Sequence, residues 1–264
     1  MQKYNIPPSA QEEQFSVFIM KLAIDLPLDP MMQRYREGTC RDRIIHDFIL
    51  ADAAKLGRDL TFLDIGCGKG FDTDIPLQES LVRAAGNYIG IEPDTAVTPG
   101  EYIKDVRRCL FEQADLPPQS VDVAFAIMVL EHLADPQPFW DKLHEVLVPG
   151  GVFWALTVDS RHWFYRASLW SQKLRFKDWY LSLIYGERGK DRYENYPVFY
   201  RCNTPEQVEH YARAFSSVTC FNMARVGQCD ELFPRFLRPL SQRLENRAIQ
   251  RGKPGTLFVV RAVK

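Results

Sequence analysis

The sequence predicts an α/β fold with a doubly wound, mostly parallel sheet of seven strands, and three observations predict it. Short apolar runs alternate with segments whose apolar residues recur every three or four positions, as in strands joined by amphipathic helices. The apolar run at residues 60–65 ends in a glycine-rich segment, which is typical of a parallel strand turning into a helix. At 264 residues the chain is long enough for one covered sheet, so we expect a single domain with insertions.

The elements can be assigned in order along the chain. Ile44 and Phe48 share one helical face with Ala53, which predicts the first helix. Pro76 fits the second helix only in its first turn, where a missing N–H costs nothing, and Pro93 ends the second strand. The predicted helices cover residues 40–56, 74–85, 139–147 and 205–214, and the predicted strands cover 60–65, 88–92, 109–113, 121–128, 151–158, 218–226 and 256–263.

The regular alternation breaks after the fifth predicted strand. Residues 161–200 hold twelve aromatic side chains among arginines and lysines, so we predict an aromatic-rich helical insertion there. Between the last two strands, residues 232–249 are predicted to form helical pieces interrupted by Pro234 and Pro239. Two late strands joined in this way suit a sheet that closes with a reversed, antiparallel edge strand.

Charge and cysteine content exclude few classes of function. Lys plus Arg (33) nearly balance Asp plus Glu (34), so no overall attraction to nucleic acid is expected. The six cysteines lack C-x-x-C spacing, which favours reduced thiols over a metal site or a disulfide framework. Lys21 and Asp25 interrupt the apolar stretch near the start, unlike a signal peptide, and no stretch has the length of a membrane span. We therefore expect a cytoplasmic protein.

The glycine-rich segment follows Asp64 and has the spacing G-x-G-x-G, with Gly66, Gly68 and Gly70. Glycines at the end of a strand let the backbone turn sharply and approach a ligand closely. The dinucleotide fingerprint requires a small residue where this chain has Phe71. The glycine–lysine–serine/threonine pattern of a phosphate-binding loop is also missing from this segment.

This segment resembles the first motif of class I S-adenosylmethionine-dependent methyltransferases, Asp/Glu-x-G-x-G-x-G. Further elements of that family follow in order: an acid, Glu92, ending the second strand, Ala-Asp-Leu-Pro at 114–117, a strand at 123–128 followed by Glu-His-Leu at 131–133, and Val-Pro-Gly-Gly at 148–151. The resemblance covers about residues 40–158 and is to the Glu-His-Leu, type 11-like subgroup. It implies a Rossmann-like sheet and S-adenosylmethionine as the cofactor.

The resemblance also implies how the cofactor is held. Asp64 would lie near the methionine moiety, and Gly66 and Gly68 would let the backbone lie against the cofactor. Glu92 would accept hydrogen bonds from both ribose hydroxyls, which an ionised carboxylate can do without competing donors. Taken singly, Asp64 could instead cap a turn, and Glu92 could be a solvated strand end.

Three further positions complete the cofactor site that the resemblance implies, two of them on the adenine side. Asp115 would bind the adenine amino group, Leu116 would lie against the ring, and the backbone around Ile127 would line the methionine end. The sequence departs from the family pattern here, because Pro93 and Pro99 shorten the helix expected before Asp115.

Methyl transfer requires a base only where the acceptor must lose a proton. His132 is the candidate, because the loop after the fourth strand faces the methyl group in this family. The alternative is that Glu131 and His132 only cap or solvate the start of a helix. His162 and Tyr165 are weaker candidates, and no metal cluster is visible in the sequence.

We divide the chain into an N-terminal segment, 1–39, expected to cover the active site, and a methyltransferase domain, 40–264, with an acceptor cap at about 159–203. The cap holds nine basic and five acidic side chains, which suits an anionic acceptor, a membrane surface or RNA.

We expect methylation of an oxygen atom of a small or medium-sized acceptor: a glycan, a lipid-linked molecule or a specialised metabolite. Peripheral membrane contact stays open, and the sequence does not give the oligomeric state. An anionic acceptor, a membrane surface or RNA could equally be bound by four arginines near the C-terminal end: Arg235, Arg238, Arg243 and Arg247.

Three rival functions are weighed against this one. An RNA- or DNA-modifying methyltransferase would carry Asp/Asn-Pro-Pro-aromatic after the fourth strand or a cysteine nucleophile near it, and neither is present. A nicotinamide dehydrogenase conflicts with Phe71. A non-catalytic, cofactor-binding partner domain remains open, because a binding motif does not prove turnover.

Overall fold

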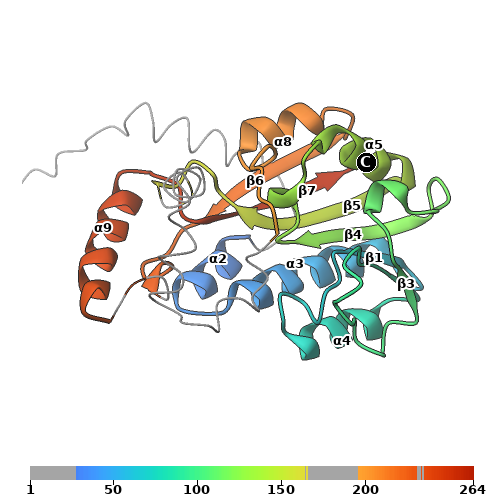
Figure 1. Ribbon diagram of the computed structural model, residues 1–264, viewed down its shortest axis with the longest axis horizontal. Coiled ribbons are helices and arrows are strands. Elements are labelled where there is room, and N and C mark those ends of the chain that lie inside the picture. The colour runs from blue at the N-terminus through green and yellow to red at the C-terminus, as the bar shows by residue number, and fades with distance from the viewer. Residues whose placement is uncertain (1–27, 164, 166–195, 231–232, 234) are drawn as a thin grey trace, which may run out of the picture.

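A single seven-stranded sheet organises the computed structural model, which describes residues 28–163, 165, 196–230, 233 and 235–264. Figure 1 shows this sheet between layers of helices. The strands are β1 (Thr61–Ile65), β2 (Asn87–Ile91), β3 (Asp105–Arg107), β4 (Val121–Ile127), β5 (Leu147–Val158), β6 (Ser217–Met223) and β7 (Leu257–Val263). The α-helices are α2 (Leu28–Arg36), α3 (Arg41–Leu56), α4 (Ile75–Ala84), α5 (Pro136–Val146), α8 (Pro205–Tyr211) and α9 (Arg238–Gln250), with short 3-10 helices η1 (Phe111–Gln113), η2 (Leu130–His132) and η6 (Arg235–Leu237).

The strand order β3-β2-β1-β4-β5-β7-β6 confirms the doubly wound α/β prediction. β1 pairs in parallel with both β2 and β4, so the order of the strands reverses direction at β1. β7 is antiparallel to both β5 and β6. The predicted reversed strand is therefore present, one position inside the edge that β6 forms. Ligands of such sheets bind beyond the carboxyl ends of the strands where the order reverses, here between β1 and β4.

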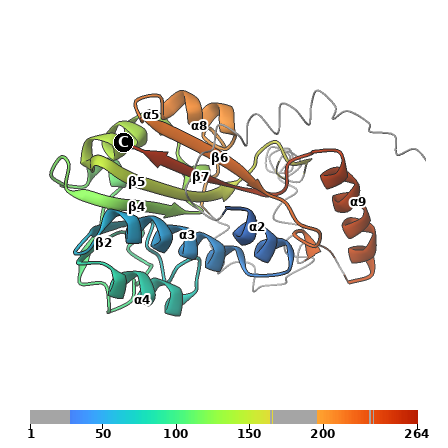
Figure 2. The same cartoon turned by 180° about the vertical axis from the view of Figure 1, so that it is seen from behind.

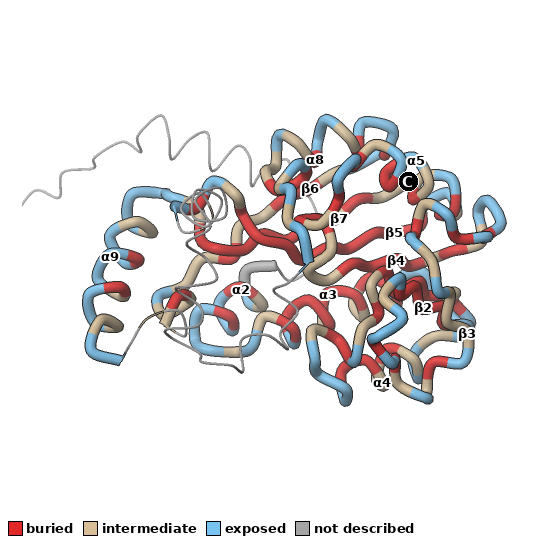
Figure 3. Tube along the Cα trace, viewed as in Figure 1, coloured by how far each residue is buried: buried red, intermediate tan, exposed pale blue. Residues whose placement is uncertain are grey.

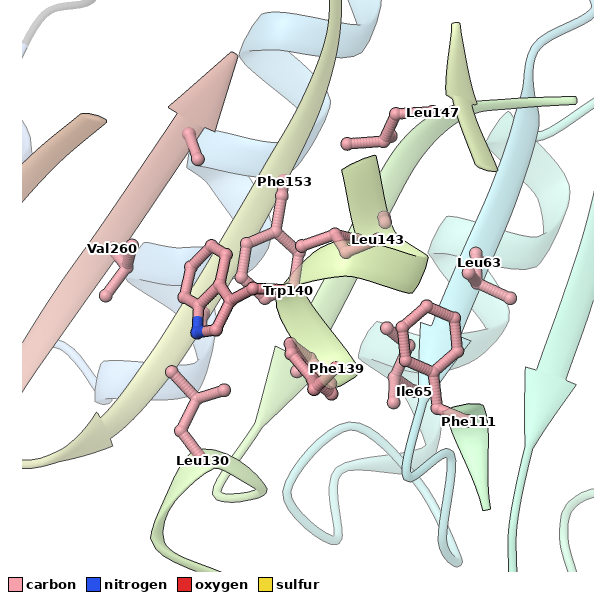
Figure 4. Packing of buried hydrophobic residues seen from close by; sticks show 14 of the residues in the cluster. Leu63, Ile65, Phe111, Leu130, Phe139, Trp140, Leu143, Leu147, Phe153 and Val260 are labelled. Carbon is pink, nitrogen blue, oxygen red and sulfur yellow. The ribbon is translucent and has the colours of Figure 1, made fainter. Parts of the chain in front are cut away.

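The sheet has one buried hydrophobic cluster on each face, and successive residues of a strand belong alternately to the two clusters. In β5, Phe153 packs in the cluster beneath α5 and α8, whereas Trp154 packs in the cluster beneath α2, α3 and α4. Figure 3 shows the buried residues running along the central strands, and Figure 4 shows Phe139, Trp140 and Phe153 of the first cluster in contact. Strands buried on both faces require almost continuous apolar runs, which is why β4 and β5 were clear in the sequence.

Side chains at the helix starts agree with the sequence signals. The carboxylate of Asp74 accepts a hydrogen bond from the backbone N–H of Leu77 (3.0 Å), and Pro76 lies in the first turn of α4 as predicted. Asp135 caps α5 in the same way, with Pro136 as the first helical residue. These caps fix where each crossover helix leaves the sheet.

One predicted element was wrong. The strand predicted at 109–113 is replaced by β3, which ends at Arg107, and by η1. The apolar run misled because β3 is a half-exposed edge strand with charged residues, while Phe111 reaches the core from a 3-10 turn. The helical pieces predicted at 232–249 are present as η6, which ends at Leu237, and α9, in whose first turn Pro239 lies; Pro234 lies outside the described residues.

The described end of the predicted N-terminal segment packs against the domain. Met32 and Tyr35 of α2 are buried in the second cluster together with residues of α3. Among the described residues, no helix is both long and apolar enough to cross a membrane.

We predict that Phe153→Ala lowers the free energy of unfolding by about 3–5 kcal/mol, because it opens a cavity in a fully buried aromatic cluster. Chemical denaturation followed by circular dichroism measures the loss. Leu56→Ala is the control, since Leu56 is 39% exposed and its truncation should cost less than about 1 kcal/mol. Equal losses in both variants would contradict the assigned core.

Candidate functional site

The predicted site residues of three strands meet at one edge of the sheet. Asp64 is the penultimate residue of β1, Glu92 follows β2 directly, and His132 lies in η2 just after β4. These strands are parallel, so their carboxyl ends lie at the same edge, on both sides of the point where the strand order reverses.

The glycine loop after β1 is tied to the end of β2. The backbone N–H groups of Gly66 and Cys67 both donate to the carbonyl oxygen of Ile91, at 2.8 and 3.0 Å. The N–H of Gly68 donates to Oε2 of Glu92 at 3.0 Å. The loop and the acidic residue, recognised separately in the sequence, therefore form one hydrogen-bonded unit.

Gly66 and Gly68 serve the loop in different ways. Both have positive φ angles, +77° and +51°, which disfavour other residues. A Cβ on Gly66 would lie 2.6 Å from Cγ2 of Val129, so this glycine allows the loop after β4 to pack closely. A Cβ on Gly68 would meet no protein atom nearer than 3.8 Å. The backbone at Gly68 therefore has an open face that a ligand can approach.

Asp64 is buried and held by two donors. Its Oδ2 accepts hydrogen bonds from the hydroxyl of Tyr88 (2.6 Å) and from Nε2 of Gln78 (2.8 Å). Burial raises the pKa of Asp64 from 3.8 to about 6, the two hydrogen bonds oppose this rise, and the nearby charge of Glu92 adds to it. A cationic ligand group next to this carboxylate would therefore be stabilised by a weakly screened charge.

Gln78 connects Asp64 to the loop, and sequence reasoning did not find it. Its Nε2 also donates to the carbonyl oxygen of Cys67 at 2.6 Å, and its Oε1 accepts from the hydroxyl of Tyr102 at 2.6 Å. Tyr88 and Gln78 belong to no part of the recognised motifs. Only their three-dimensional proximity to Asp64 identifies them as residues that orient it.

Glu92 is 7% exposed, and its carboxylate already accepts two backbone hydrogen bonds. Oε2 binds the N–H of Gly68 and Oε1 binds the N–H of Asp94 (2.9 Å). Each carboxylate oxygen has about two acceptor positions, so one on each oxygen remains for further donors. Burial raises the pKa of Glu92, and the two backbone N–H groups oppose that rise.

The other three predicted cofactor positions, two on the adenine side and one at the methionine end, differ in how far they are buried. Asp115 is exposed after η1, whereas Leu116 is buried in the first hydrophobic cluster. Ile127 is half-buried at the end of β4 and pairs with Leu156. The family's expected helix before Asp115 is replaced by a loop, which the guanidinium of Arg108 closes by donating to two backbone carbonyl oxygens.

His132 has one ring nitrogen committed to a neighbouring backbone. Its Nδ1 lies 2.8 Å from the carbonyl oxygen of Pro197. Because a carbonyl oxygen can only accept, this contact assigns the proton of neutral His132 to Nδ1 and leaves Nε2 as an acceptor. The ring of Tyr196 packs edge-on against the imidazole, with 5.9 Å between the centroids.

Glu131 is not a solvated helix start, which was the alternative for this motif. It is 3% exposed, and its Oε2 accepts a hydrogen bond from the hydroxyl of Thr157 at 2.8 Å. Its backbone carbonyl accepts from the N–H groups of Phe199 (2.8 Å) and Tyr200 (3.4 Å). Glu131 thereby joins the end of β4 to the segment that contains Pro197.

Two tyrosines lie near Glu131 on the side predicted to take the acceptor. The rings of Tyr165 and Tyr200 contact edge to face, with centroids 5.9 Å apart. Burial raises the pKa of Tyr200 to about 12, and it also raises the pKa of Tyr165. Both phenols are therefore neutral donors near neutral pH. His162, the other weaker candidate for a base, is 6% exposed, and burial lowers its pKa.

Most of the predicted acceptor cap, residues 164 and 166–195, lies outside the described residues. Within the described part, no group of three or more His, Cys, Asp or Glu side chains is arranged to hold a metal ion.

The chain matches the model of the family described as "Methyltransferase domain" over residues 32–195. The chain belongs to this methyltransferase family. A solved S-adenosylmethionine-dependent methyltransferase from Archaeoglobus fulgidus has the same fold, with a TM-score of 0.51, 12% identity and coverage of 84% of this chain and 94% of that one. The fold of this methyltransferase is therefore the class I fold, and S-adenosylmethionine is the methyl donor of the family.

Sequence relatives of this methyltransferase match over shorter regions. The ubiquinone biosynthesis O-methyltransferase of Bradyrhizobium sp. (strain ORS 278) is 30% identical over 112 residues, which are 39% of this chain and 42% of that protein. The sterol 24-C-methyltransferase of Yarrowia lipolytica (strain CLIB 122 / E 150) is 27% identical over 139 residues, 47% of this chain and 34% of that protein. The matched regions thus span less than half of each of these relatives.

We predict that Gly68→Ala weakens binding of S-adenosylmethionine to this methyltransferase by at least about tenfold, which corresponds to ~1.4 kcal/mol. The new methyl group would occupy the open face next to Glu92 without meeting other protein atoms. Gly150→Ala is the matched control, because Gly150 also has a positive φ (+80°) and open space but lies at the start of β5. Isothermal calorimetry should show weaker binding for Gly68→Ala alone, and unchanged affinity there would refute the assigned cofactor face.

We also predict that the affinity for S-adenosylmethionine falls as the pH drops below about 6, because protonation of Asp64 would remove the charge that we expect to face the ligand's ammonium group. The dissociation constant should approach a tenfold rise per pH unit below that value. In Asp64→Asn the affinity should be weak at pH 7 and change much less between pH 5 and 7. An equally steep pH dependence in the Asn variant would assign the effect to another group.

Proposed function

We propose that this methyltransferase transfers the methyl group of S-adenosylmethionine to an oxygen atom of a small or medium-sized acceptor. A glycan, a lipid-linked molecule or a specialised metabolite would fit this description. The observation that carries the proposal is the state of His132, whose Nδ1 is bound to the Pro197 carbonyl so that Nε2 remains a proton acceptor. His132 lies in η2, just after β4, at the edge of the sheet where we predict that the cofactor binds.

The residues at the sheet edge fit the cofactor's chemistry. S-adenosylmethionine carries an ammonium group, a ribose with two hydroxyls and no phosphate, so carboxylates suit it better than a phosphate-binding loop. Asp64 would face the ammonium group, and the free acceptor positions of Glu92 would receive the ribose hydroxyls. The open backbone at Gly68 would lie against the cofactor. When bound, S-adenosylmethionine supplies a methyl group activated by the adjacent sulfonium.

His132 would act on the acceptor rather than on the cofactor. Nε2 of His132 would take the proton of the acceptor hydroxyl, whose oxygen would receive the methyl group that S-adenosylmethionine supplies. The resulting imidazolium keeps its Nδ1–H bond to the carbonyl of Pro197, and the adjacent carboxyl of buried Glu131 can stabilise its charge when ionised. Alignment of the acceptor by the surrounding aromatic residues would contribute the remaining rate enhancement.

The relatives support the class of acceptor. One is an O-methyltransferase of ubiquinone biosynthesis and another is a sterol 24-C-methyltransferase, so both names refer to small molecules. The choice of oxygen rests on His132, since a neutral hydroxyl needs a base at the moment of transfer.

We predict that His132→Ala lowers kcat by about 10²–10⁴-fold while the dissociation constant of S-adenosylmethionine changes little, because the imidazole acts only on the acceptor. Calorimetric titration with S-adenosylmethionine, S-adenosylhomocysteine and NADH establishes the cofactor first. Turnover is then measured as S-adenosylhomocysteine formation with a panel of hydroxylated acceptors.

His210→Ala is the matched control, because His210 is exposed on α8 and should be replaceable without loss of turnover. Unchanged turnover in His132→Ala would remove it as the base. If neither adenosyl ligand bound the native chain, the proposal of methyl transfer would fail altogether.

A further inference from the structure

Helix α9 extends beyond the end of the sheet where β4 and β5 finish, as Figures 1 and 2 show from opposite sides. Its inner face is fixed by polar contacts. The carboxylate of Glu245 accepts hydrogen bonds from the backbone N–H groups of Gly227 (2.5 Å) and Cys229 (2.9 Å). Nε2 of Gln242 donates to Oδ2 of Asp230 at 2.7 Å. The orientation of the helix is therefore defined, and so is its outer face.

The outer face of η6 and α9 carries a stripe of large apolar side chains. Phe236 of η6 is 79% exposed, and Leu240 and Leu244 of α9 are 56% and 51% exposed. Leu240 and Leu244 are four residues apart in α9, so they lie on one side of that helix, and Phe236 lies in η6 directly before it. Side chains of this size are normally buried, and an exposed stripe of them marks an interaction surface.

The same segment is strongly basic. Residues 235–253 contain six cationic side chains and one acid, Glu245, whose carboxylate is turned inward to the backbone of the preceding loop. Within the part of the chain that the structure describes, none of the six cations takes part in an ion pair. They are Arg235, Arg238, Arg243, Arg247, Arg251 and Lys253.

We propose that η6 and α9 form a docking surface for a membrane containing anionic lipids. An interfacial helix of this kind buries its apolar side chains in the headgroup region, while long cationic side chains reach the lipid phosphates. Charge complementarity selects this partner. A second copy of the chain would bring two sets of six cations together, and a nucleic acid would leave the stripe of Phe236, Leu240 and Leu244 unburied.

The position of this surface connects it with the predicted acceptor side. Trp163, five residues after β5, is 50% exposed, and its ring lies 6.4 Å from that of Phe233, just before η6. The start of the docking surface is therefore next to the segment that follows β5. A membrane bound there would lie near the end of the sheet where we propose the methyl acceptor binds, which goes beyond the proposed reaction itself.

The test is co-sedimentation of the full chain with vesicles of phosphatidylcholine alone or with about one-third phosphatidylglycerol, since cationic residues respond to anionic lipid. The native chain should bind the anionic vesicles at least about tenfold more tightly. Neutralising Arg243 and Arg247 to Gln should weaken that binding by about 25-fold, from about fivefold for each charge. Leu240→Ser with Leu244→Ser should weaken binding to anionic vesicles by at least about tenfold.

Leu56→Ser and Arg83→Gln are the matched controls, because both side chains are exposed on helices other than α9. Circular dichroism would establish that each variant folds. Absence of binding to anionic vesicles, equal binding to both vesicle types, or equal losses in the control variants would overturn the proposal. Displacement of the chain from the vesicles by a stoichiometric amount of RNA would also overturn it, in favour of a nucleic-acid surface.

Discussion

The hydrogen bonds between the glycine loop and the end of β2 are the constraint on which the candidate site depends. Three successive backbone N–H groups, from residue 66 to 68, bind the carbonyl of Ile91 and the carboxylate of Glu92. Without these bonds, nothing would hold the loop in the conformation that leaves the backbone at Gly68 open to a ligand. Positive φ angles make this arrangement accessible to glycine and costly for other residues. The loop sequence and the acid 24 residues later are thus parts of one structure.

Holding carboxylates in this setting has a cost in stability. Because the pKa of Asp64 is raised from 3.8 to about 6, the native state binds more protons than the unfolded state between those values. The contribution of Asp64 to the free energy of unfolding therefore decreases as the pH rises through that range, and at pH 7 the buried charge is destabilising. Tyr88 and Gln78 reduce this cost through hydrogen bonds to Oδ2. A bound cation would reduce it further, so ligand binding and stability are coupled.

The sequence predicted best those elements whose structure depends on residues that are adjacent in the chain. Strands buried on both faces need apolar runs, and a tight turn needs glycines, so β1, β4 and the loop at Gly66 could be predicted. The sequence predicted least well those features that depend on contacts between residues far apart in the chain. β3 is a charged edge strand without an apolar run, and the bond from Gln78 to Asp64 exists only because α4 crosses the end of β1. The burial of Glu131 likewise depends on a partner, Thr157, in another strand.

The contact between His132 and Pro197 makes the candidate base depend on a segment 65 residues away. That segment is also joined to η2 through the backbone carbonyl of Glu131, which binds the N–H groups of Phe199 and Tyr200. The chain that returns from the predicted acceptor cap therefore orients the imidazole and assigns its proton to Nδ1. If the segment moved away, His132 would lose the bond that leaves Nε2 free to accept a proton. The backbone contacts of residues 197–200 therefore orient both the imidazole of the candidate base and the end of the segment that returns from the predicted cap.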